Sequence, residues 1–213
     1  MLEARDITFG YGNGPLVLEG FDLQVAPGER VALAAPSGFG KSTACRLLAG
    51  YERPASGQVL VDGRPLPRKG ACPVQLIQQH PELAVDPRRR MAATLREAGE
   101  VQPELVERFG IRREWMSRFP HELSGGELQR FCIVRALAAN PRYLVADEIS
   151  TMLDAVTQAQ IWHALVDECD ARGTGMVLVT HSPALTQRIA LLRTTTARCA
   201  EHAPTRRNPS EYL

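Results

Sequence analysis

The chain has 213 residues, of which 44% are hydrophobic, and 25 Lys and Arg residues against 24 Asp and Glu residues give a formal net charge of +1. A chain of this length and composition can bury a substantial core, which excludes global disorder. The balanced charge removes any bulk electrostatic argument for an anionic membrane surface or for nucleic acid, so no nucleic-acid partner is expected.

We expect no leader, membrane span or disulfide framework from the sequence. Residues 1–6 lack a basic start followed by an apolar run, and no apolar stretch approaches the ~20 residues of a membrane helix. The five cysteines include no CxxC pair, so reduced cytosolic thiols are expected. We interpret the run Arg88-Arg89-Arg90 as an exposed, solvated loop. If this protein works at a membrane, a partner must hold it there.

The first third of the chain predicts strands around a glycine-bearing loop. Residues 2–9 and 16–25 have strand patterns split by a Gly-Asn-Gly-Pro turn. The short, wholly apolar segment 31–34 suits a strand that is buried on both faces of a parallel sheet. The loop and a helix over 41–49 follow, and then residues 57–61 predict another strand.

Helical patterns replace strands in the middle of the chain. The strand signal fades from residue 79 to about 119, where residues 90–97 and 103–109 look helical, and we interpret this region as part of an inserted helical lobe. Ser124 is predicted to cap a helix that ends before Asn140-Pro141.

The last third of the chain returns to a strand and helix alternation. Residues 143–146 and 176–179 are apolar and β-prone, which predicts central parallel strands, and an amphipathic helix is predicted between them over 157–170. The tail over 204–213 is polar and expected to be loose.

A strand, a glycine loop and a helix that opens with Lys-Ser predict a phosphate-binding loop at residues 35–43. Backbone N–H groups and the helix dipole attract anions, Lys41 can reach the β- and γ-phosphates, and the Ser42 hydroxyl can ligate Mg²⁺. Gly38 and Gly40 permit a close backbone approach. The alternative is an ordinary strand-turn-helix link. The usual first glycine is Ala35, which costs roughly a kcal/mol if that position needs a positive φ and nothing if it merely ends the strand.

Two adjacent acids end the apolar run 143–146. Asp147 suits a Mg²⁺ ligand, and Glu148 can polarise a water for attack on a γ-phosphate. Buried charge is costly without a partner, which favours a functional reading. The alternative for either acid is the N-cap of a helix.

At this point the chain resembles the ATP-binding cassette (ABC) ATPase family, over nearly all of residues 1–192. The segment Leu123-Ser124-Gly125-Gly126-Glu127 is similar to the family's signature sequence, with Glu127 where glutamine is common. The resemblance implies that Ser124, Gly125 and Gly126 bind the γ-phosphate held by the opposite subunit of a dimer. The alternative is a Ser-capped helix with a glycine turn. A carboxylate at Glu127 complements the helix dipole but offsets the anion-attracting field.

The resemblance assigns further roles, residue by residue. Tyr11 matches the aromatic that stacks on adenine, with a strand-edge aromatic as the alternative. Gln79 matches the glutamine that touches Mg²⁺ and the attacking water, although Gln78 stands where an aromatic is usual. Asp154 matches the loop that crosses the dimer, and His181 matches the histidine that contacts the γ-phosphate. The nucleotide-binding set is then Tyr11, Pro36, Ser37, Gly38, Phe39, Gly40, Lys41, Ser42 and Thr43.

The expected fold is α/β: a P-loop NTPase core, mainly a parallel sheet with helices on both sides, with an antiparallel β edge and an inserted helical lobe. We expect one ABC nucleotide-binding domain over 1–213, with its ATPase core in 1–78 and 140–200 and its lobe in 79–139.

The resemblance implies an ATPase with Glu148, His181 and Gln79 as catalytic residues and Ser42, Gln79 and Asp147 as metal ligands. It implies ATP and Mg²⁺ as cofactors, and a second ABC ATPase subunit and an integral membrane permease as partners. The protein is then expected in the cytoplasm, peripheral on the inner face of the cell membrane. Residues 118–126 look like the oligopeptide and nickel importer subgroup, which leaves peptides, nickel or a metal chelate as cargo. A soluble, non-transport ABC ATPase and a nucleotide-gated binding module with little turnover are the alternatives.

Overall fold

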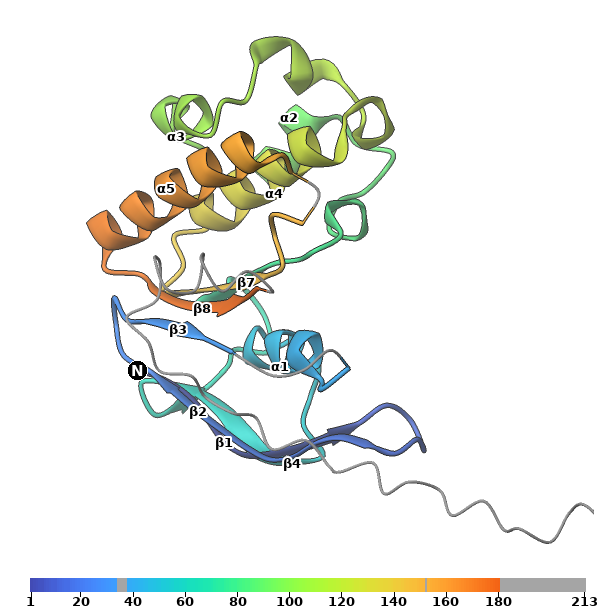
Figure 1. Cartoon of the computed structure of the whole chain (residues 1–213), viewed down its shortest axis with the longest axis vertical. Helices are drawn as coiled ribbons and strands as arrows, with labels where there is room; N and C mark the ends of the chain where they lie inside the picture. The colour runs from blue at the N-terminus through green and yellow to red at the C-terminus, as the bar shows by residue number, and fades with distance from the viewer. Residues whose placement is uncertain (34–37, 152, 181–213) are drawn as a thin grey trace, which may run out of the picture.

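The computed structural model describes residues 1–33, 38–151 and 153–180. It contains two β-sheets with helix α1 between them, and a cap of helices over the far face of the second sheet (Figure 1). The expected α/β fold with an antiparallel edge and helices on both sides of a parallel sheet is confirmed.

The first sheet is antiparallel and holds four strands in the order β2-β1-β4-β5. The strands are β1 (Leu2–Gly10), β2 (Leu16–Val25), β4 (Ser56–Val61) and β5 (Arg64–Pro65). Alternation along β2 puts Phe21, Leu23 and Val25 in the core and the residues between them in solvent. This sheet therefore has one wet face, as the sequence pattern predicts.

The second sheet is parallel and has the order β3-β8-β7-β6. Its strands are β3 (Arg30–Ala32), β8 (Gly175–Val179), β7 (Tyr143–Asp147) and β6 (Val74–Ile77). Every residue of β7 and β8 is buried, because both faces of the sheet are covered. Strand β6 is not among the elements predicted from the pattern, since its four residues include the polar Gln75.

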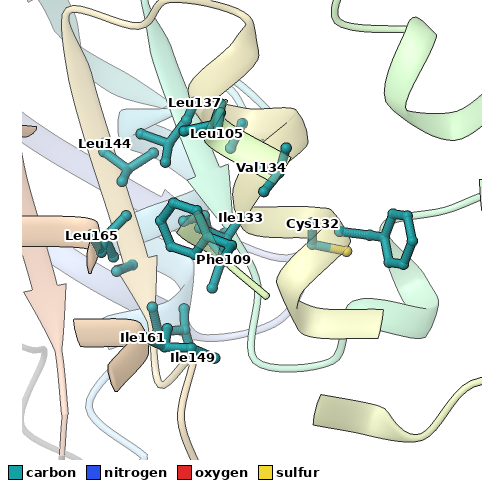
Figure 2. Close-up of a cluster of buried hydrophobic side chains, with 14 of the residues drawn as sticks. Leu105, Phe109, Cys132, Ile133, Val134, Leu137, Leu144, Ile149, Ile161 and Leu165 are labelled. Atoms are coloured by element: carbon teal, nitrogen blue, oxygen red, sulfur yellow. The ribbon is translucent and has the colours of Figure 1, made fainter. Parts of the chain in front are cut away.

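The two faces of the parallel sheet belong to two hydrophobic clusters. Val145 and Val177 face α1 (Lys41–Leu48) and the antiparallel sheet. Leu144 and Leu178 face the opposite way, toward α4 (Gly125–Ala138) and α5 (Ala155–Arg172). Figure 2 shows this second cluster, where Ile133 and Leu137 of α4 meet Leu144, Ile161 and Leu165. Helix α1 and helix α4 thus lie on opposite faces of one sheet.

Short helices and turns form the outer part of the helical cap. They are η1 (Pro81–Leu83), α2 (Met91–Arg96), α3 (Pro103–Arg108), η2 (Arg113–Ser117) and η3 (Pro120–Glu122). Met91, Leu105 and Trp115 anchor α2, α3 and η2 to the same cluster that covers the sheet. The inserted helical lobe proposed for residues 79–139 stays a prediction.

The arginine run at residues 88–90 and the cysteines that the structure describes lie outside the strands of both sheets. Arg88 pairs with Asp86, Arg89 pairs with Glu97, and the Arg90 guanidinium lies over a phenylalanine ring, so the arginine run is exposed and partnered. The four cysteines of the described ranges are free. In those ranges no helix combines the length and apolar character needed to cross a bilayer.

Candidate functional site

The candidate site gathers at the carboxyl ends of the parallel strands. Lys41 and Ser42 follow β3 through the glycine loop, Gln79 follows β6, and Asp147 with Glu148 ends β7. The carboxyl ends of neighbouring parallel strands open at the same edge of a sheet, which is where open α/β sheets bind ligands. Topology alone therefore brings together three segments that are far apart in the sequence.

Two glycines shape the loop that opens α1. Gly38 and Gly40 have φ values of 82° and 72°, in the left-handed region that glycine adopts without strain. Gly40 is the N-cap of α1, and a Cβ there would lie 2.8 Å from the Val17 side chain. Glycine at 40 is therefore required by backbone conformation and by space. Ala35, Pro36 and Ser37 lie outside the described residues.

Asp147 is a buried carboxylate held beside α1. Its side chain is 7% exposed and accepts a hydrogen bond from Ser42. Burial raises the pKa of Asp147 and nearby Glu148 adds to this, while the bond from Ser42 and the charges of Arg46 and Lys41 act against it. Within the described part of the chain, Asp147 Oδ1 is a buried oxygen without a hydrogen-bond partner.

Glu148 lies beside Asp147 but points to a different neighbour. Gln79 Nε2 donates to Glu148 Oε2 at 3.0 Å, across 69 residues of sequence. The backbone N–H of Glu148 donates to the Val179 carbonyl at 3.0 Å, which extends the β7–β8 ladder by one residue. Its φ of 50° is in the left-handed region, which costs a non-glycine residue roughly 1–2 kcal/mol. The fold thus holds Glu148 in a strained backbone conformation, with its carboxylate against Gln79.

Tyr11 lies over the start of α1. Its hydroxyl is 3.3 Å from Thr43 Oγ1, its ring meets Phe9 edge-on at 4.9 Å, and the side chain is 45% exposed. Phe39 is exposed as well. Two aromatic side chains near the phosphate loop therefore leave ring surface open to solvent, where a planar base could stack.

The signature segment forms the capped end of α4. Ser124 Oγ accepts from the Glu127 backbone N–H at 3.2 Å, and Glu127 Oε2 accepts from the Ser124 N–H at 2.8 Å. This reciprocal pair is a capping box, which satisfies two backbone donors. The carboxylate at 127 therefore has a structural role, in addition to its effect on the field at the helix start.

Asp154 caps the next helix. Asp154 Oδ1 accepts from the N–H groups of Val156 and Thr157 at 3.1 and 3.0 Å. The hydrogen bond from the Thr157 side chain, together with these N–H bonds, lowers the pKa of Asp154. Neither Asp147 nor Glu148 is a helix cap, so that alternative is wrong for both. Asp154 has this role within its own chain, and its contact across a dimer stays a prediction.

Sequence reasoning did not find Ser150, a buried residue of the turn after Glu148. Its hydroxyl accepts from Gln158 Nε2 at 2.8 Å and from Trp162 Nε1 at 3.1 Å. These two residues fasten the turn to α5. A lone serine gives no sequence signal for such a role.

The predicted site residues separate into two groups within one chain. Residues 38–43, Gln79 and residues 147–148 gather at the carboxyl ends of the strands, whereas the signature residues 124–127 open a helix on the opposite sheet face from α1. His181 lies outside the described residues. One chain therefore contains a cluster of site residues at the strand ends, which we call the half-site, and a separate glycine-bearing helix start at α4.

The half-site fits a divalent cation bound to phosphate. Mg²⁺ prefers oxygen ligands, and Asp147 Oδ1 and the Ser42 hydroxyl are adjacent oxygens, one of them buried and unpartnered in the described ranges. Gln79 and Glu148 add an amide and a second carboxylate beside them. A glycine loop, a lysine and these oxygens define a P-loop nucleotide-binding site.

The chain belongs to the ABC transporter family, whose model matches residues 18–151. It is an ATPase subunit of this family, with ATP and Mg²⁺ as its cofactors.

Relatives named as nickel import ATP-binding proteins are similar to this chain. NikE of Pseudomonas putida is 40% identical over 190 residues, which cover 80% of this chain and 70% of that protein. NikE of Staphylococcus aureus is 30% identical over 203 residues, which cover 89% of this chain and 83% of that protein.

Solved structures have the same fold. A structure described as the ATP binding subunit of an ABC transporter has a TM-score of 0.77 and 27% identity, covering 89% of this chain and 83% of that one. The ATP-binding cassette MJ0796, solved as a dimer in a post-hydrolysis state with ADP and Pi, has a TM-score of 0.78 and 22% identity. The match covers 94% of this chain and 98% of that one. The expected family and P-loop fold are confirmed.

Proposed function

We propose that this chain is the ATP-hydrolysing subunit of a membrane importer for nickel or a nickel chelate. The observation that carries the cargo assignment is the 40% identity to a nickel import ATP-binding protein. The membrane and binding components of such systems select the cargo, and the ATPase subunit does not. The similarity therefore supports nickel as cargo only through the kind of transport system in which the relative works. The proposed location is the inner face of the cell membrane, where a permease holds the chain.

The residues at the strand ends have different proposed roles in nucleotide binding and hydrolysis. The glycine loop and Lys41 bind the β- and γ-phosphates, and Tyr11 offers its exposed ring to adenine. Asp147 and Ser42 would hold Mg²⁺, with Gln79 near by; when bound, this ion neutralises charge on the phosphates.

Glu148 is the proposed general base. It accepts a proton from the water that attacks the γ-phosphorus, while the bond from that phosphorus to the β–γ bridging oxygen breaks and ADP leaves. The amide of Gln79 holds one carboxylate oxygen at 3.0 Å, which orients the carboxylate of Glu148. We assign the contact with the γ-phosphate to His181.

The second helix start supports a shared site. Ser124 and the Gly125 and Gly126 amides open α4 on the sheet face opposite α1, the helix that follows their own chain's phosphate loop. In a head-to-tail dimer each signature would meet the partner's γ-phosphate, as the family resemblance implies. ATP then joins two subunits, and hydrolysis releases them, which converts chemistry into opening and closing.

A groove at the side of the molecule is the proposed permease contact. Its volume is about 560 Å³, and it lies between the end of α1, the segment around Cys72 and the ends of α2 and α4. Tyr51 lines it, and Leu83 is exposed on the adjoining η1. Large exposed apolar side chains beside a groove favour a protein partner over solvent.

Replacing Glu148 with Gln tests both the chemistry and the cargo. In a strain that lacks this chain, we expect wild type to restore uptake of radiolabelled nickel. The variant Glu148→Gln should fail and should lower ATP turnover by about 10²- to 10⁴-fold. Glu114→Gln, on the exposed surface of η2, is the matched control and should behave as wild type.

Other outcomes would redirect the proposal. Defective uptake of labelled peptides with normal nickel uptake would assign the cargo to peptides. ATP turnover with no uptake defect of either kind would contradict transport and favour a soluble ABC ATPase. Equal turnover by wild type and Glu148→Gln would contradict the role of Glu148.

A further inference from the structure

One side of α4 hydrogen-bonds the backbone of the segment that follows β6. Three side chains of α4 donate to three carbonyl oxygens of residues 78–84, and we call this set the carbonyl ladder. Its bonds run from Gln129 to Gln78 at 3.2 Å, from Cys132 to Pro81 at 3.7 Å and from Arg135 to Ala84 at 2.6 Å. Donors and acceptors both recur every third residue, so the two segments are in register.

Helical geometry explains the register. Residues three apart lie on the same side of an α-helix, and η1 (Pro81–Leu83) is a 3₁₀ turn with three residues per turn. In Figure 2, Cys132 points to the side of α4 away from Leu144 and Leu165, so this middle donor lies on a side of the helix that does not face these residues. Two elements with matching periods can therefore bond along their length.

The donor of the first bond of the ladder is buried. Gln129 is 3% exposed, and its amide donates to a carbonyl in a partly buried setting. A buried polar side chain without such a partner is unfavourable, so this bond is strongly retained in the fold. Gln129 is polar at a core position for which packing alone would favour an aliphatic residue.

This first bond lies next to a proposed catalytic side chain. The acceptor belongs to Gln78, and the next residue is Gln79, whose amide is 3.0 Å from Glu148 Oε2. Fixing the Gln78 carbonyl fixes the peptide plane between these two residues, because that unit is rigid. The position of Gln129 therefore sets where the Gln79 side chain begins.

We infer that Gln129 is a positioning residue that holds Gln79 against Glu148. Gln129 is also five residues along α4 from Ser124, so the ladder joins the signature helix and the Gln79 segment into one unit. The bond from Arg135 to Ala84 borders the groove described above, at the far end of the same unit. The inference rests on the proposed roles of Gln79 and Glu148.

The test replaces Gln129 with methionine, which keeps the length of the side chain and removes its donor. Thr174→Val is the matched control. Thr174 is also 3% exposed and donates to a backbone carbonyl at 3.2 Å, but it lies just before β8, at the opposite end of that strand from the site. Hydrogen exchange is followed in the peptide over residues 78–84, and ATP turnover is measured on the full chain with and without Gln79→Ala.

We expect Gln129→Met to speed exchange in residues 78–84 and to lower kcat by about tenfold or more with little change in the KM for ATP. In the Gln79→Ala background, Gln129→Met should cause no further loss of kcat, because the side chain that Gln129 positions is absent. Thr174→Val should leave exchange over 78–84 and turnover unchanged. If Gln129→Met does not fold, Gln129→Asn retains the amide but is too short to reach, and it should give the same pattern.

Two results would overturn the inference. One is unchanged exchange over residues 78–84 in both Gln129 variants. The other is a loss of kcat in Gln129→Met that is fully additive with Gln79→Ala. A normal kcat in Gln79→Ala alone is a different outcome, because it contradicts the proposed role of Gln79, while faster exchange in Gln129→Met would still support the ladder.

Discussion

Replacing Asp147 with asparagine should make the nucleotide-free protein more stable. The carboxylate is 7% exposed, and one of its oxygens has no hydrogen-bond partner in the described part of the chain. Burial raises the pKa of Asp147 above that of the unfolded chain, so the folded state binds the proton more tightly. Its ionisation therefore costs folding free energy, and this cost grows as pH rises from the unfolded pKa to the folded pKa and is fully present above both.

The magnitude follows from what asparagine changes. A buried acceptor that lacks a partner costs about 1–3 kcal/mol, and a charged one costs more. Asparagine removes the charge but weakens the bond from Ser42, which is worth about 1 kcal/mol. The net gain is about 1 kcal/mol, which for a chain of this size raises Tm by roughly 2–4 °C.

Thermal unfolding with and without Mg²⁺-ATP measures the stability of the nucleotide-free protein and its stabilisation by nucleotide. Without nucleotide at neutral pH, Asp147→Asn should melt above wild type. At about 100 times the Kd, Mg²⁺-ATP should add about 2.7 kcal/mol to wild type and clearly less to the variant, so that their order reverses. Asp170→Asn is the control, because Asp170 is half exposed in an ion pair with Arg30 and should change stability by less than about 1 kcal/mol.

The reasoning is refuted if nucleotide-free Asp147→Asn is less stable than wild type near neutral pH. It is also refuted if Mg²⁺-ATP stabilises the two proteins equally.

Three further changes test other parts of the site. Ser124→Ala removes half of the capping box with Glu127 and should lower the free energy of unfolding in urea by about 0.5–2 kcal/mol. It should also strongly lower ATP turnover while the monomer still binds ATP, and full turnover would contradict the proposed shared site. Gly40→Ala combines a φ of 72° with a Cβ 2.8 Å from Val17, so Tm should fall by several degrees, and an unchanged Tm would contradict the strained-loop argument. Tyr11→Phe should keep nucleotide affinity and Tyr11→Ala should lose about tenfold in equilibrium binding; equal affinities would exclude stacking.

Much of the fold follows from local pattern. The apolar segment 143–146 predicts a buried parallel strand, and β7 is buried at every residue. Ser124 predicts a helix start, and it is the N-cap of α4. These elements obey short-range rules, in which burial sets the composition of a strand and a side chain satisfies the first backbone donors of a helix.

Other features depend on contacts that a linear pattern does not contain. Strand β6 is only four residues long and is stabilised by pairing with β7. The contact between Gln79 and Glu148 joins residues 69 positions apart and is set by the order of strands in the sheet. Gln129 looks like a polar residue on an amphipathic helix until its acceptor on the Gln78 carbonyl is known. Long-range partners of polar groups are therefore the part that sequence reasoning leaves undetermined.

The close packing of Gly126 against Leu153 has a consequence for any variant of the signature. A Cβ at residue 126 would lie 2.7 Å from Leu153 Cδ2, and Leu153 directly precedes Asp154, the cap of α5. Even a methyl group added at the start of α4 would therefore require the end of the Leu153 side chain to move, beside the turn that leads into the next long helix. Loss of function after such a change cannot be credited to the proposed contact with a partner's phosphate alone, because the same change would also displace the Leu153 side chain within its own chain.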